Sequence, residues 1–141
     1  MIFRPGSTLV AAALAAALCL PAFAQTTSQD VSKKTADAVD TLKSYTVEKK
    51  NDAVAYGKKL MRSADRDIKK LERAAGKASD ETKAQLKEEV KDLKAARAAA
   101  AKKFDEMGKA SGEAWDSTKN GFADAYQDLR QGLEKAKKNL K

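Results

Sequence analysis

Residues 71–86 read LERAAGKASDETKAQL, and they decide the fold because they place a turn between two helical patterns. Gly76 suits the left-handed position that follows many helices. Ser79 suits a helix N-cap, and the two acids after it suit a first turn. The stretch therefore predicts that one helix ends near Ala75 and that another begins near Ser79.

A similar stretch follows 32 residues later, where GKASGE at 108–113 repeats GKASDE at 76–81. Gly112 takes the place of an acid, so the second start signal is weaker. A repeated turn is typical of a duplicated helical unit. We expect turns near 76–79 and near 108–112.

Apolar positions recur every three or four residues from Leu60 to Leu140, which is the period of an α-helix. Some of them also form a row spaced by eleven residues, a spacing that favours straight or slightly right-handed supercoiling. The row is Leu60, Leu71, Thr82, Leu93, Phe104, Trp115 and Tyr126.

The apolar step passes through both expected turns without a slip, so one long helix stays open as an alternative. A lone helix, however, cannot bury side chains as large as Phe104 and Trp115. The sequence therefore favours an all-α fold, either an antiparallel helical hairpin or a three-helix bundle with coiled-coil packing.

The segment before this row has a weaker pattern. Residues 25–30 are polar, and we expect them to be flexible. Helical spacing continues over 31–56, and Gly57 is a candidate kink or helix end. We thus expect a single helical coiled-coil domain over 31–141, with a further turn near residue 57.

The first 24 residues have the anatomy of a secretory signal peptide. Arg4 supplies a positive charge, and residues 9–20 form an apolar run that is shorter than the roughly 20 residues of a membrane span. Residues 21–24 then read Pro-Ala-Phe-Ala, a helix stop and a small-x-small cleavage motif. We expect cleavage after Ala24 and export to the periplasm of a Gram-negative-type envelope.

Cys19 raises the alternative of a lipoprotein anchor. Lipidation in bacteria wants a small residue directly before the cysteine, and Leu18 stands there. Cys19 also lies within the apolar run, before the cleavage motif, so we favour a discarded apolar residue.

Removal of the leader takes away both prolines, the only cysteine and one of the 28 Lys and Arg residues, while all 20 Asp and Glu residues stay. The chain has no histidine. The usual ligands of zinc, copper and haem are therefore missing, and so is a histidine base. We expect no catalytic residues, no cofactor and no metal, and we interpret the chain as a non-enzymatic protein.

The large apolar side chains of the second half form the expected contact face between helices. These candidate residues are Leu71, Leu93, Phe104, Met107, Trp115, Phe122, Tyr126 and Leu129. The same face could lie in a bilayer interface, since Lys residues accompany Phe and Trp as in amphipathic membrane-surface helices. Core packing is favoured over membrane contact.

Charges of both signs alternate along the helical patterns, and pairs such as Asp65–Lys69 and Glu134–Lys138 have the favourable spacing of four. Such spacing is typical of a solvated helix face. Since acids interrupt the lysines, no basic stripe stands apart, and aromatics are not interleaved with one. Nucleic acid is therefore a disfavoured partner.

Two resemblances rest on these residues. The segment KASGEAW at 109–115, with Gly121-Phe122 and AYQDL at 125–129, resembles a bacterial family of small stress-responsive coiled-coil proteins first noted in cyanobacteria. The spacing of eleven and KKTADAV at 33–39 are similar to late-embryogenesis-abundant and apolipoprotein-like chains. The first resemblance implies a helical stress protein without catalytic residues, and the second implies protection of membranes or proteins.

These observations together predict an exported helical protein with a structural or protective, stress-related role in the cell envelope. We expect it to act by helix–helix association, with itself or with a protein partner. The alternative is a peripheral lipid-binding protein on an anionic membrane surface. The oligomeric state stays open at this point.

Overall fold

The computed structural model describes residues 28–140, and the expected signal peptide at 1–24 lies outside the described residues. Over this range the chain forms helices and turns and no strand, so the predicted all-α class is confirmed. The elements are α1 (Ser28–Ser44), the short 3-10 helix η1 (Val47–Lys49), α2 (Lys50–Gly76), α3 (Asp80–Lys109) and α4 (Trp115–Lys138).

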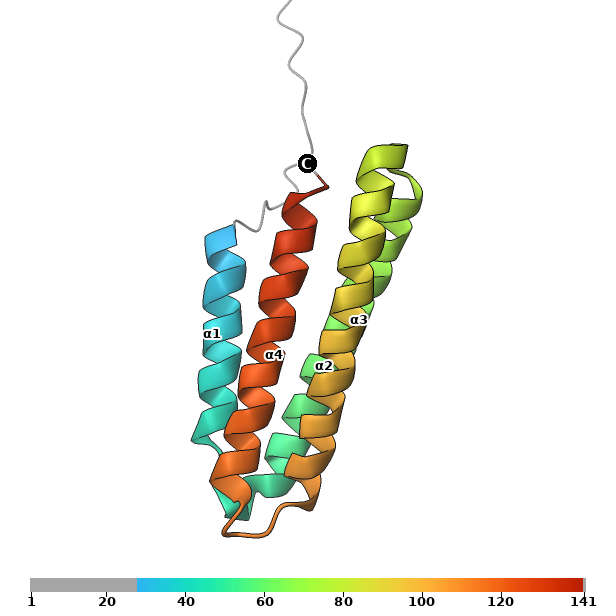
Figure 1. Cartoon of the computed structure of the whole chain (residues 1–141). Coiled ribbons are helices and arrows are strands. Elements are labelled where there is room, and N and C mark those ends of the chain that lie inside the picture. Colours follow the sequence, from blue (N-terminus) through green and yellow to red (C-terminus); the bar gives the residue numbers. More distant parts are fainter. Residues whose placement is uncertain (1–27, 141) are drawn as a thin grey trace, which may run out of the picture.

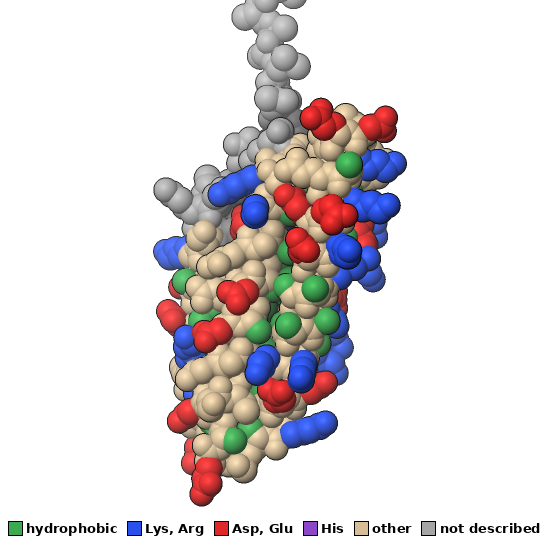
Figure 2. Space-filling model, in the orientation of Figure 1, with side chains coloured by type: hydrophobic (Ala, Val, Ile, Leu, Met, Phe, Trp, Pro, Cys, Tyr) green, Lys and Arg blue, Asp and Glu red, His purple; other side chains and the backbone are tan. Residues whose placement is uncertain are grey.

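The four long helices pack side by side (Figure 1). Helix α4 lies between α1 and α3, and α2 packs behind them, mainly against α3 and also against α4. The α2–α3 hairpin is longer than its neighbours and projects beyond the end of α4. The outer surface carries charges of both signs, as Figure 2 shows for one face.

The sequence-based expectation of two or three helices is wrong, because the described residues form four α-helices. Two of them, α1 and α2, lie between Ser28 and Gly76. The break lies at 45–49 and has neither glycine nor proline to mark it. The main-chain N–H of Lys49 bonds to the oxygen of Thr46 at 2.9 Å and closes a tight turn there. Contacts from α4 hold this turn, and they are invisible in a local pattern.

The expected turn near residue 57 is also wrong, since Gly57 lies inside α2 and is buried. A Cβ atom at this position would stand 2.8 Å from Cε2 of Phe104 and 3.0 Å from Cε1 of Phe122. The glycine therefore serves a close approach of aromatic rings from α3 and α4 rather than a helix end.

The other two turns are present, because α2 ends at Gly76 and α3 ends at Lys109. Their geometry differs from the expectation. No glycine between residues 28 and 140 has a positive φ. The chain instead leaves α2 through Lys77, whose N–H bonds to the oxygen of Ala74 at 3.2 Å. Ser79 is the N-cap of α3, but its hydroxyl donates to the Thr82 hydroxyl rather than accepting from the backbone.

The expectation of a flexible stretch at 25–30 is wrong for residues 28–30, which form the first turn of α1. Residues 25–27 lie outside the described part of the chain. No helix of the described part is both long enough and apolar enough to span a bilayer.

Candidate functional site

Seven of the eight predicted contact residues are buried, and Phe104 is half-buried. The rings of Phe104 and Phe122 lie 5.3 Å apart between centroids and are tilted by 58°, and the Phe122 and Tyr126 rings lie 6.4 Å apart. Such tilted pairs are favourable beyond the area that they bury. The predicted contact face is thus the core of this chain.

Little apolar surface is left over for a second molecule. Among the described residues only two large hydrophobic side chains are exposed, Val47 at 38% and Leu140 at 37%. Val47 lies in η1, at one end of the bundle, and Leu140 follows α4 at the other end, so they form no continuous patch (Figure 1). The contact face therefore works within the chain, and any partner meets a polar exterior.

Lys119 is a buried cation that the sequence analysis missed. Its side chain is only 6% exposed. The ammonium donates hydrogen bonds to the main-chain oxygens of Lys43 at 2.8 Å and Tyr45 at 2.9 Å, and to the Asp116 carboxylate at 3.2 Å. A cation favours the carbonyl end of a helix because of its unsatisfied oxygens and its dipole. Lys119 therefore holds the end of α1 against α4.

Arg130 is the second buried cation, with a side chain 10% exposed. Its guanidinium donates to the Tyr126 hydroxyl at 2.8 Å, to Asp67 at 2.5 Å and to Ser63 at 2.8 Å. Burial acts to lower the pKa of Arg130, but the hydrogen bonds and charges of Tyr126 and Asp67 hold this pKa above its ordinary value. The group stays charged and ties α4 to α2.

The sequence contains a pattern that could have predicted the burial of Lys119 and Arg130. Lys119 stands four residues after Trp115 and three before Phe122, and Arg130 stands between Tyr126 and Leu133 in the same way. A charged residue at the spacing of the apolar stripe points to a buried, partnered cation.

Three acids of α2 pair with cations of α3 or α4. Asp65 accepts two bonds from Arg97 of α3, at 2.7 and 3.0 Å. Glu72 lies 2.5 Å from the ammonium of Lys94, also on α3. Asp65 is therefore paired with Arg97 rather than with the expected Lys69. The bidentate geometry of this pair, between α2 and α3, is one that Arg favours.

The other intrahelical pair also differs from the expectation. Glu134 lies 3.5 Å from Lys137 rather than pairing with Lys138. Lys137 in turn lies 3.8 Å from Asp67 of α2, so the C-terminal turn of α4 joins the same polar network as Arg130.

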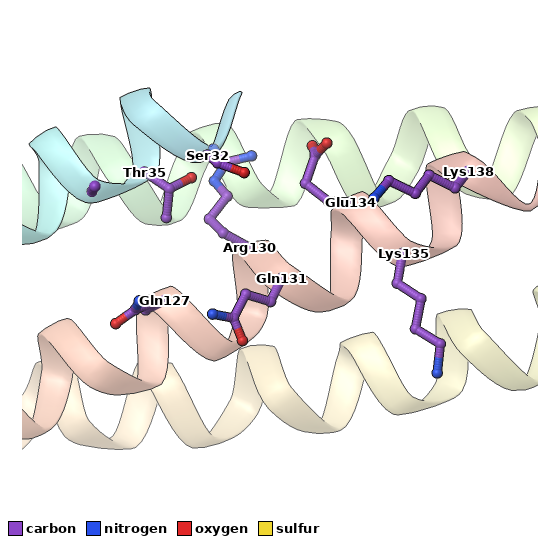
Figure 3. A pocket seen from close by; sticks show the side chains of 9 residues that line it. Ser32, Thr35, Gln127, Arg130, Gln131, Glu134, Lys135 and Lys138 are labelled. Carbon is purple, nitrogen blue, oxygen red and sulfur yellow. The ribbon is translucent and has the colours of Figure 1, made fainter. Parts of the chain in front are cut away.

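A cavity of about 340 Å³ opens between α1 and α4 (Figure 3). The lining side chains point in different directions: Arg130 and Glu134 point to one side of α4, and Lys135 points to the other. Arg130 is occupied by its partners on α2 and α4. The cavity is lined by Ser32, Thr35, Ala36, Gln127, Arg130, Gln131, Glu134, Lys135 and Lys138.

A larger groove of about 630 Å³ lies between the end of α2 and the start of α3. Ala75 and Val90 contribute its apolar part, and Lys83, Lys87 and Lys91 contribute ammonium groups. Within residues 28–140 no group of three or more His, Cys, Asp or Glu side chains could hold a metal ion. Charged surfaces, rather than a convergent reactive centre, are what the fold presents.

Comparison of the chain with protein-family models, with curated proteins and with solved structures finds no match, so the function is argued from its residues.

Proposed function

We propose that this chain is a non-enzymatic exported helical protein with a structural or protective role in the cell envelope. The observation that supports the proposal is the single core shared by all four helices, which consumes their apolar faces. The stress-related part of the role rests on the sequence resemblance to stress-responsive coiled-coil proteins. Export rests on the leader at 1–24.

Helix–helix association in this proposal acts first within the chain. Side chains such as Leu71, Leu93 and Leu129 are at most 3% exposed, so they join helices of one molecule. A protein partner, or a second copy, then meets the charged outer faces of the bundle. Such contacts depend on salt more than contacts through an apolar face.

The second candidate is a peripheral lipid-binding protein. Lipid contact through the apolar face requires the helices to separate, because Trp115 and Phe122 are at most 2% exposed. Contact through a charged face leaves the bundle folded. The two routes differ in what happens to Trp115.

The test of the main proposal uses residues 25–141 in buffer, at two protein concentrations and with or without anionic vesicles. We expect helical circular dichroism, cooperative melting and buried-tryptophan emission without lipid. Helicity that appears only after vesicles are added would contradict a preformed bundle. A melting temperature that rises with protein concentration would indicate oligomers.

The protective role has its own assay. The folded protein is mixed with a heat-labile enzyme, and light scattering is followed on warming. We expect delayed aggregation with the wild type, and less delay with a Gly57→Leu variant, whose side chain cannot fit beside Phe104 and Phe122. Equal delay with serum albumin at the same mass would contradict a specific protective role.

A further inference from the structure

The outward side of α2 carries only basic charges from Lys58 to Lys77. All eight of these basic residues are exposed, and none of them takes part in an ion pair between described residues. We call this set the basic face. It consists of Lys58, Lys59, Arg62, Arg66, Lys69, Lys70, Arg73 and Lys77.

The basic face stands apart because the acids of the same stretch point elsewhere. Asp65, Asp67 and Glu72 are the carboxylates between Lys58 and Lys77, and each pairs with a cation of α3 or α4. The sequence expectation that no basic stripe stands apart is thus wrong for α2. The ion pairs neutralise the three acids that alternate with these bases in the sequence.

The basic face forms a stripe along one side of α2. At 3.6 residues per turn its members fall within roughly one third of the helix circumference. The buried side of α2, which includes Ala64, Ile68 and Leu71, lies opposite. At about 1.5 Å per residue the face is about 28 Å long.

Helix α3 adds further positive charge beside the end of this face. Lys83, Lys87 and Lys91 are exposed, follow one another at steps of four and line the groove between α2 and α3. Glu88 is the one unpaired carboxylate in the lining of that groove, since Glu72 is bound to Lys94. Figure 2 shows blue side chains gathered along the outer edge of the α2–α3 hairpin.

The exposed charges of the other three long helices include acids. Those of α3 are Asp80, Glu81, Glu88, Asp92 and Asp105. Asp37 and Asp40 of α1 are exposed, and so are Asp116, Asp124 and Asp128 of α4. The basic face from Lys58 to Lys77 therefore differs from the surfaces of α1, α3 and α4, where exposed charges of both signs are mixed. A face of one sign favours one orientation of the bundle on a plane of opposite charge.

We propose that the basic face is a docking surface for an anionic lipid bilayer, which the folded bundle meets with α2 lying along the membrane plane. The inference rests on the second candidate function and names the surface that serves it. Side chains within one third of a straight helix reach a plane together, and juxtamembrane Lys and Arg are attracted by anionic headgroups.

Lipid is favoured over nucleic acid by the composition of the face. None of its eight members is aromatic, and Tyr56, the nearest ring on α2, is only partly exposed and lies 6.1 Å from the ring of Tyr45. Stacking platforms for bases are therefore not offered there. The expected export also points to an envelope surface.

The test compares two variants with equal loss of charge. The basic-face variant carries Lys59→Gln, Arg66→Gln, Lys69→Gln and Arg73→Gln. The control carries Lys33→Gln, Lys34→Gln, Lys102→Gln and Lys109→Gln, all at exposed positions outside α2. Glutamine is a good helix former, and circular dichroism melts check that both variants fold.

Binding is measured by co-sedimentation with phosphatidylglycerol–phosphatidylcholine vesicles at low salt. Each basic residue near such a surface contributes about fivefold in partitioning, so the basic-face variant should bind roughly a hundredfold or more weakly. The control should lose far less. Binding of the wild type should vanish on pure phosphatidylcholine and at about 1 M salt, where the Debye length is about 3 Å.

Several outcomes overturn the proposal. Equal losses in the two variants show that net charge alone acts. Tighter binding of the wild type to duplex DNA than to vesicles at equal phosphate assigns the face to nucleic acid. Self-association at low salt that the basic-face variant abolishes, without vesicle binding, assigns it to a second copy.

Trp115 separates this inference from the apolar lipid-binding route. Docking of the folded bundle leaves its emission unchanged, because the indole stays in the core. An emission change on vesicles, together with undiminished binding of the basic-face variant, overturns the docking surface while the lipid-binding function stands. If neither the wild type nor any variant binds vesicles, both the docking surface and the lipid-binding function are ruled out. The structural or protective role is not affected by that result.

Discussion

The indole N–H of Trp115 donates a hydrogen bond of 3.0 Å to the main-chain oxygen of Tyr45, which lies 70 residues earlier in the chain. Lys119 donates to the same oxygen at 2.9 Å. Two side chains from the first turns of α4 thus bind one carbonyl just after α1. At the same end, Lys50 of α2 donates to the oxygen of Ala110, which follows α3, at 2.7 Å. Cations from neighbouring helices therefore satisfy two helix ends.

Replacement of Lys119 by methionine should destabilise the bundle. The aliphatic stem is kept, but the oxygen of Lys43 loses its partner, and burial of an unsatisfied polar group costs about 1–3 kcal/mol. The free energy of unfolding is measured by urea titration. Lys34→Met, at an exposed site of α1, is the control and should change it by less than about 0.5 kcal/mol. Equal effects of the two would contradict the role of Lys119.

Alanine should have opposite effects at two glycines. Gly57→Ala gains about 1 kcal/mol in helix propensity, but its Cβ would stand 2.8 Å from Phe104, and overpacking costs about 1–3 kcal/mol. Gly108 has no heavy atom within 4 Å of its added Cβ. Gly108→Ala should therefore stabilise the protein by up to about 1 kcal/mol. The melting temperatures of the two variants show whether each substitution stabilises or destabilises the protein. A stabilising Gly57→Ala would show that the rings of Phe104 and Phe122 move aside freely.

The ion pair of Asp67 and Arg130 should matter more than that of Asp65 and Arg97. Asp67→Leu leaves a buried guanidinium with neutral partners, at an expected cost of about 3–5 kcal/mol. Arg130→Met in the same chain should recover much of this loss. The side chains of Asp65 and Arg97 are 37% and 39% exposed, so Asp65→Ala should cost less than about 1 kcal/mol.

Double-mutant cycles on the two pairs provide the measurement. Coupling free energies come from chemical unfolding of the wild type, the two single variants and the double variant in each cycle. A coupling at the exposed pair equal to or larger than that at the buried pair would contradict the expectation.

Helix α1 should open separately from the rest of the bundle. It buries Ala38, Val39 and Leu42, and it packs chiefly against α4. Elements with few buried apolar contacts exchange their amides through low-energy local openings. Native-state hydrogen exchange should therefore show a lower opening free energy for α1 than for α3. Lys119→Met should lower it further, whereas exchange of α1 amides only on global unfolding would contradict a separable helix.

Periodic apolar spacing sufficed to predict the helical class and most of the core, and the glycine, serine and acidic residues at 76–81 and 108–113 predicted the two marked turns. Met107 and Leu133, for example, are fully buried as their positions on the stripe require. The break at 45–49 was not predicted from the sequence because no glycine or proline marks it. The turn predicted near Gly57 was wrong for the opposite reason, since the lack of a side chain at this glycine serves ring packing rather than a turn.

By itself the sequence determined the helical class, the absence of histidine chemistry and the face of each long helix that is buried, because these follow from residue type and period. Only the tertiary structure decided which of the charges are paired. Asp65, Asp67 and Glu72 alternate with bases in the sequence, and the fold pairs each of them with a cation of α3 or α4. The helix period groups the bases of residues 58–77 on one side of α2, but the ion pairs of the neighbouring acids join residues far apart in the chain, so no local pattern contains those pairs.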